Sequence, residues 1–187
     1  MILLIAGLTL WAGVHLIPAL AIPIREQLIS KLGEMGYKGI FAILLITAIV
    51  AMVFGWRSID PVAIYVLPAW SRYVTTLLML ATFILFSASN STTNIKRVIR
   101  HPQLTGLVLW SVGHLLSNGD NRSLVLFGTL AAWAIVEMIL INKREGEWSK
   151  PEVASIKAEL ITVAVGLVMF TIFLFAHPYI AGMPVLA

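Results

Sequence analysis

The feature that most constrains this chain is a series of long apolar stretches that contain very few charged side chains. Of its 187 residues, 59% are hydrophobic and only 12% are charged, whereas a soluble domain carries about 25% charged residues. A helix needs about 20 apolar residues to cross the hydrocarbon core of a bilayer. Six stretches approach or reach that length: residues 2–24, 40–56, 73–89, 102–117, 124–141 and 159–176.

These stretches predict helices rather than strands, because they are long and do not alternate polar with apolar residues. Within lipid the backbone must also satisfy its own hydrogen bonds, which favours helices. We therefore expect an all-α fold, a polytopic membrane bundle of six transmembrane helices that forms one domain over residues 1–187. The first stretch has no basic segment before it and no small-residue cleavage pattern, so we interpret it as a helix rather than a signal peptide.

Basic residues are distributed unevenly among the segments between these stretches. Residues 25–39, 90–101 and 142–158 carry ten Lys and Arg residues, whereas residues 57–72, residues 118–123 and the tail carry three. The positive-inside rule places the first set in the cytoplasm. We therefore predict a multi-pass membrane protein with both termini on the side away from the cytoplasm, whose expected partner is membrane lipid and not nucleic acid.

One segment of the chain is repeated. Residues 7–17 read GLTLWAGVHLI and residues 106–116 read GLVLWSVGHLL, so Gly, Leu, Trp and His recur at identical spacing. The alternative is a coincidence within a small apolar alphabet. Because each half would contain three helices, the halves would enter the membrane from opposite sides. This predicts a 3+3 inverted repeat, an arrangement that places binding sites near the midplane.

The repeat carries two histidines, His15 and His114, inside the predicted membrane segments. Ionisable residues in the membrane are rare and are candidate functional residues. Side chains lean toward the N-terminus of their helix, so on oppositely directed helices these two imidazoles would lean toward each other. With no cysteine in the chain and no carboxylate beside them, they suit bis-histidine ligation of haem iron. A zinc site would need three or four ligands, and the alternative role is a hydrogen bond to a neighbouring helix.

Each of these histidines has the same neighbours in sequence. Trp11 and Trp110 precede the histidines by four residues and share their helical faces. Gly13 and Gly113 lie beside them and would let a flat ligand or another helix approach closely. We therefore include these four residues in the candidate cofactor site. A third histidine, His177, follows the sixth stretch and is expected to lie at the membrane interface.

Polar residues gather at the cytoplasmic start of the fourth stretch, in the sequence RHPQ. Pro102 suits the first turn of a helix, so His101 could be an interfacial cap. A more specific hypothesis is that Arg100, His101 and Gln103 form a polar pocket that binds a carboxylate or a phosphate. Glu137 in the fifth stretch needs a partner if it is buried, and we expect it to pair with Arg100 or His101.

The segment between the fourth and fifth stretches contains a predicted turn at residues 118–120, followed by Ser123 as the expected N-cap of the next helix. Arg122 in this segment could bind a haem propionate if the acidic edge of the porphyrin faces the periplasm. Arg100 is the equivalent candidate if that edge faces the cytoplasm, and the residues alone do not choose between them.

The segment RHPQLTGLVLWSVGHLLSNGDNRSLVLFG at residues 100–128, together with WAGVH in the first stretch, resembles the NnrU family of bacterial membrane proteins. The resemblance covers nearly the whole chain, and it implies a protein of the bacterial inner membrane with both termini in the periplasm. NnrU proteins are associated with denitrification and nitric oxide metabolism, which implies a link to those processes here. The resemblance extends to the zeta-carotene isomerase of plants and cyanobacteria, which carries haem b and isomerises a carotenoid double bond using the iron.

The haem histidines of that isomerase match His15 and, in the WxxxH pattern, His114. The resemblance therefore implies haem b, iron ligated by these two residues, and a hydrophobic polyene or a gas as the ligand. The isomerase has a cysteine three residues before the second histidine, where this chain has Ser111. A redox-dependent exchange of ligands is therefore not available, and it stays open whether the chain is an isomerase, an oxidoreductase or no enzyme.

Two other functions stay open. RHPQLTG at residues 100–106 resembles the RHPxYxG signature of membrane isoprenylcysteine and phospholipid methyltransferases, which bind S-adenosylmethionine at the cytoplasmic side. Those enzymes continue with an arginine and paired glutamates, and NKREGEW at residues 142–148 is a loose match. A non-enzymatic transporter or accessory factor would instead use the inverted repeat around a water-accessible cavity.

Overall fold

The computed structural model describes residues 1–183 and 185, and its elements over this part of the chain are helices. The long helices are α1 (Ile2–Leu20), α2 (Ile22–Arg57), α3 (Ser71–Ser89), α4 (Pro102–Leu115), α5 (Asn121–Glu145) and α6 (Ile156–Ala181), with a short 3-10 helix η1 (Asn94–Arg97) between α3 and α4. The predicted all-α fold class is confirmed for the described residues.

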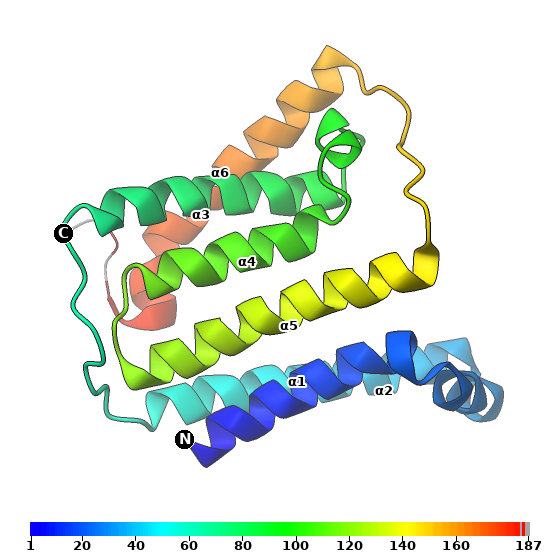
Figure 1. The fold of residues 1–187 in the computed structure, drawn as a ribbon, viewed down its shortest axis with the longest axis horizontal. Helices are drawn as coiled ribbons and strands as arrows, with labels where there is room; N and C mark the ends of the chain where they lie inside the picture. The colour runs from blue at the N-terminus through cyan, green and yellow to red at the C-terminus, as the bar shows by residue number, and fades with distance from the viewer. Residues whose placement is uncertain (184, 186–187) are drawn as a thin grey trace.

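The lengths of the helices support a membrane protein. By length and composition, α2, α3, α5 and α6 can each cross a membrane. α1 is apolar but shorter, and α4 has 14 residues, which corresponds to about 21 Å of helix. Figure 1 shows α4 lying between α3 and α5, so neighbouring helices cover it on both sides.

The helices pack in an order that differs from their order in the chain. Figure 1 shows α3, α4 and α5 side by side, with α1 and α2 along the far side of α5 and α6 crossing behind α3. The start of α1 and the end of α6 lie at the same end of the bundle. Because α1 packs mainly on α2 and α5, whereas its counterpart α4 packs on α3 and α5, the two halves are not matched in their packing. The inverted repeat therefore stays a prediction.

Two close helix crossings depend on glycine. A Cβ atom added at Gly55 of α2 would lie 2.4 Å from the backbone nitrogen of Leu4 in α1. A Cβ atom added at Gly166 of α6 would lie 2.7 Å from Cα of Ile84 in α3. Small residues at such crossings let helix backbones approach closely, which is how helices associate in lipid.

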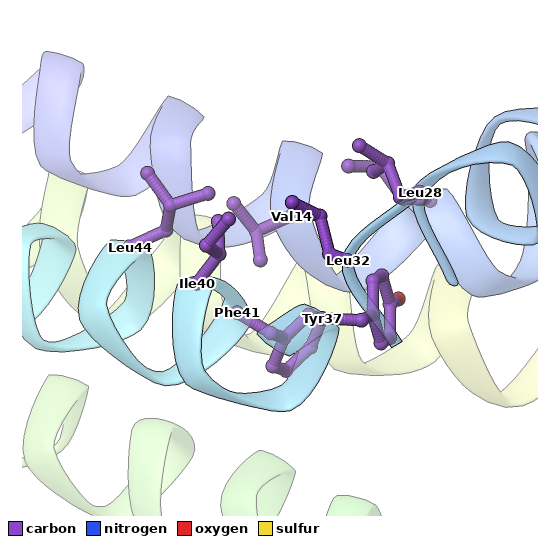
Figure 2. Close-up of a pocket in the computed structure, with 8 residues that line it drawn as sticks. Val14, Leu28, Leu32, Tyr37, Ile40, Phe41 and Leu44 are labelled. Carbon is purple, nitrogen blue, oxygen red and sulfur yellow. The ribbon is translucent and has the colours of Figure 1, made fainter. Parts of the chain in front are cut away.

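Residues 25–39, which the charge distribution predicts to be a loop, are instead part of α2. The helix begins at Ile22 and is interrupted at Gly33, whose φ of 72° and ψ of 166° are not helical. Apolar residues recur at helical spacing before this break, and Leu28 and Leu32 turn back toward α1. Figure 2 shows the pocket that they form with residues of α1 and the second part of α2. Its volume of about 40 Å³ and apolar walls make it too small for a cofactor.

The segment at residues 118–120 is held by the loop that follows α2. The N–H of Ile64 donates a hydrogen bond to the carbonyl of Gly119 at 2.7 Å. The hydroxyl of Tyr65 donates to the carbonyl of Leu115 at 2.7 Å, and its oxygen also lies 3.0 Å from the carbonyl oxygen of Asn118. Burial, with the charge of Asp120, raises the pKa of Tyr65 above its ordinary value, so the phenol remains a donor at neutral pH.

The N-cap of α5 is Asp120, and the prediction of Ser123 was wrong. The Asp120 carboxylate accepts hydrogen bonds from the N–H of Ser123 at 2.9 Å and from its hydroxyl at 2.8 Å. Ser123 thus occupies the third helical position, where its N–H needs an acceptor.

Substitution of Asp120 by alanine should lower the free energy of unfolding by about 1 kcal/mol, because the first turn of α5 loses its cap. Thermal unfolding in detergent would measure this change. Asp120→Asn should recover most of it, since an asparagine side chain also caps helices. Equal stability of all three proteins would contradict a capping role.

Candidate functional site

His15 lies in a cluster of aromatic side chains between α1, α2 and α5. The centre of its ring is 4.3 Å from that of Trp11, 4.8 Å from that of Trp133 on α5 and 5.7 Å from that of Phe41 on α2. Its Nδ1 lies 2.9 Å from the carbonyl oxygen of Trp11. Because a carbonyl oxygen only accepts hydrogen bonds, Nδ1 carries the proton, and Nε2 of the neutral ring carries the lone pair.

His114 has the same arrangement between α4, α5 and α6. Its ring centre is 4.5 Å from that of Trp110 and 4.5 Å from that of Phe127 on α5, which stacks on it at an angle of 28°. Its Nδ1 donates to the carbonyl of Trp110 at 2.8 Å, so its Nε2 also carries the lone pair. A third ring lies near it, that of His177 on α6, with its centre at 6.5 Å.

The predicted pairing of each histidine with the tryptophan four residues earlier is confirmed, but the two histidines belong to different clusters. His15 contacts α5 at Trp133, whereas His114 contacts it at Phe127. These two α5 residues are six positions apart, which separates them by about 9 Å along the helix axis and about 120° around it. The ring contacts of His15 and His114 thus lie on different faces of α5. Shared ligation of one iron by this pair stays a prediction.

The two glycines beside the histidines face different surroundings. A Cβ atom added at Gly113 would lie 2.5 Å from Met79 Cε of α3, so this glycine admits another helix rather than a flat ligand. A Cβ atom added at Gly13 would meet nothing within 4 Å. Gly13 instead lines a groove of about 400 Å³ between α1 and α5, whose walls are largely apolar: Ile5, Leu8, Thr9, Ala12, Gly13, Leu16, Val125 and Thr129.

The polar residues at the start of α4 form contacts with the end of α5. The Arg100 guanidinium donates to the carbonyl of Gly146 at 2.8 Å and lies 3.5 Å from the carboxylate of Glu145. Nε2 of His101 lies 2.9 Å from Oδ1 of Asn142. Gln103 is exposed beside them. These residues form the proposed anion pocket, and the methyltransferase alternative would bind its cofactor in the same place. The guanidinium and the imidazole of this pocket therefore already have partners within the chain.

The side chain of Arg122 also has partners within the chain. Its guanidinium lies 3.7 Å from the centre of the Trp56 ring and donates to the carbonyls of Trp56 at 3.3 Å and Ile59 at 2.9 Å. These contacts fasten the start of α5 to the end of α2 and leave the side chain 16% exposed. Arg122 therefore has a structural role in this arrangement, away from the imidazole of either cluster.

Glu137 does not pair with Arg100 or His101, and that prediction was wrong. Its side chain is 8% exposed, and its Oε2 has no hydrogen-bond partner among the described residues. It lies on the same face of α5 as Trp133, one turn further along, and the indole N–H of Trp133 is likewise buried without an acceptor. The nearer partners of Arg100 and His101 at the end of α5 explain why neither reaches Glu137.

His177, which we expect at the membrane interface, lies near the end of α6 and close to His114. The sixth apolar stretch ends at residue 176, but α6 continues through Pro178 to Ala181. His177 thus lies on the last turns of α6, partly exposed, with its ring centre 6.5 Å from that of His114. The only signal in the sequence was a histidine one residue beyond an apolar stretch, followed by a proline that α6 accommodates without ending.

The fold and these clusters define a helical membrane protein with two partly buried imidazoles held by matching tryptophan motifs. The model of the NnrU protein family matches residues 3–185. The chain therefore belongs to the NnrU family. Neither the search of curated proteins nor the search of solved structures gave a match.

Proposed function

We propose that this chain is a haem b-binding protein of the bacterial inner membrane, with six membrane crossings and both termini in the periplasm. The observation that carries the proposal is the fixed orientation of its membrane imidazoles. In both WxxxH motifs, Nδ1 donates to a backbone carbonyl and leaves Nε2 for another partner. Histidines that bind metals hold their second ring nitrogen in this way.

The surroundings of His114 suit an axial ligand. Phe127 and Trp110 pack on its ring, which fixes the orientation of the imidazole and limits the access of water. Among the described residues, no group of three or more His, Cys, Asp or Glu side chains could hold a metal ion without further ligands. A porphyrin supplies four nitrogen ligands itself, so one or two imidazoles are enough to complete the coordination of its iron.

Bound haem would supply redox and gas-binding chemistry at its iron. Membership of the NnrU family supports a task linked to nitric oxide and denitrification. The groove between α1 and α5 favours a second task, redox-type isomerisation of a polyene lipid. An apolar chain would fit its largely apolar walls, and Gly13 leaves them without a side chain at that point.

The visible spectrum of the full chain tests this proposal. The protein is produced in haem-replete cells, purified in detergent and analysed for haem per polypeptide. We expect a Soret band and close to one b-type haem per chain. A colourless, monodisperse protein that also fails to take up added haemin would overturn the proposed function.

A further inference from the structure

We propose that His177 is the residue that completes the coordination of a metal centre with His114, and that His114 and His177 are therefore the two axial ligands of the haem. This inference rests on the proposed function. Neither the tryptophan motif nor the family match assigns a role to His177. The argument comes from the separation, the orientation and the hydrogen bonds of the two rings.

The separation of the ring centres is compatible with two ligands of one metal ion and is longer than that of two stacked rings. The centres of His114 and His177 are 6.5 Å apart, with 31° between their planes. His114 and Phe127, at a similar angle of 28°, stack with their centres at 4.5 Å. A metal ion lies roughly 2.1 Å from an imidazole nitrogen and roughly 3.2 Å from the ring centre. Two rings on opposite sides of one ion thus have centres roughly 6.4 Å apart.

Both imidazole rings also form the same kind of hydrogen bond through Nδ1. Nδ1 of His177 lies 2.7 Å from the carbonyl oxygen of Met183, and Nδ1 of His114 lies 2.8 Å from that of Trp110. In each case the carbonyl accepts, so Nδ1 carries the proton and Nε2 carries the lone pair. Two neighbouring imidazoles with their Nε2 lone pairs free have no proton to share between them, and a metal ion is the partner that both can bind.

A turn after α6 provides the carbonyl that holds His177. Gly182 adopts the left-handed conformation, with φ of 77° and ψ of 5°, and ends the helix. The chain then reverses, which brings the Met183 carbonyl back to the ring of His177 six residues earlier. His15 and His114 use the carbonyl four residues earlier in their own helix, whereas His177 uses the carbonyl of the turn that follows α6.

His15 has no such partner ring. Its ring contacts are with Trp11, Trp133 and Phe41, and those of His114 lie on another face of α5. His15 and His177 are therefore competing candidates for the second ligand, and they make opposite predictions for two single substitutions.

The test is the spin state of the haem in the full-length protein, followed by absorption and electron paramagnetic resonance. Wild-type protein should be six-coordinate and low-spin. His177→Ala should keep its haem on His114 but become five-coordinate and high-spin, and added imidazole should restore the low-spin spectrum. His15→Ala should leave the low-spin spectrum unchanged. If His177→Ala does not fold, His177→Met replaces it; a thioether ligand should then raise the reduction potential.

Three results would overturn the inference. A low-spin spectrum that survives in His177→Ala and converts to high-spin in His15→Ala would assign the second ligand to His15. A wild-type protein with stoichiometric but high-spin haem would show that a second ligand is not bound. Both of these leave the proposed haem function intact, whereas a wild-type protein without haem would overturn the function and the ligand assignment together.

Discussion

Haem is expected to be lost from the protein when His114 is replaced by alanine, with the ratio of haem to polypeptide falling at least about tenfold. His114 is common to both ligand pairs considered above, so its removal leaves the iron with at most one protein ligand. The ring also packs between Trp110 and Phe127, and its loss opens the cluster to water. The measurement is the haem content of detergent-purified protein, determined as the pyridine complex.

Two further variants separate loss of ligation from loss of fold. His114→Gln keeps a polar side chain of similar size without an imidazole nitrogen, and should lose haem as the alanine variant does. Val112→Ala lies on α4 two residues away, with a side chain that is exposed in the bundle, and should retain haem. Full haem content in His114→Gln would show that the imidazole does not bind the iron.

Replacement of Gly119 by alanine should give the largest loss of stability, about 3 kcal/mol. A Cβ atom at this position would lie 2.2 Å from the backbone carbonyl oxygen of Tyr65, so the two segments must separate. The hydrogen bond from the Ile64 N–H to the Gly119 carbonyl would be lost with that movement. Because Tyr65 also donates to the carbonyl that follows His114 in the chain, the end of α4 would lose support as well.

Thermal or denaturant unfolding in detergent would measure this effect, with Gly128→Ala as the matched control. A Cβ atom at Gly128 would meet nothing within 4 Å, and alanine is favoured over glycine inside a helix by roughly 0.5–1 kcal/mol. The control protein should therefore be as stable as wild type or slightly more stable. Similar stability of the two alanine variants would contradict a steric role for Gly119.

The sequence was sufficient for those parts of the site that depend on a single helix. The four-residue spacing of Trp11 with His15, and of Trp110 with His114, predicted that each pair shares a face. Their ring centres are 4.3 Å and 4.5 Å apart. The uncharged stretches likewise predicted the all-helical class, because backbone polar groups in lipid must bond to one another within each segment.

Features that depend on how helices pack could not be predicted in the same way. The lean of the two imidazoles toward each other assumed that α1 and α4 are neighbours, but α5 lies between them (Figure 1). The approach of His177 to His114 depends on the oblique path of α6, which no local pattern encodes. Packing in lipid is decided by small differences in van der Waals fit and by glycine contacts such as that of Gly166 with Ile84.

Two predictions that rested on charged residues were also wrong. The basic residues in 25–39 predicted a loop, whereas the apolar residues among them recur with the period of a helix and the segment forms helix on both sides of the break at Gly33. We expected the carboxylate of Glu137 to form an ion pair with Arg100, but Arg100 has the carboxylate of Glu145 within 3.5 Å at the exposed end of α5. An arginine near the membrane surface pairs with the nearest anion that keeps it hydrated, and not with the deepest one.

The position of α5 links the two histidine clusters mechanically. One helix contributes Trp133 to the His15 cluster and Phe127 to the His114 cluster, and a helix moves largely as a rigid rod over six residues. A rotation of α5 that opens one imidazole would therefore shift the aromatic wall of the other in the same event. Ligand binding at one histidine and the opening of the other histidine to solvent would then be linked equilibria. Each event would change the equilibrium constant of the other by the same factor.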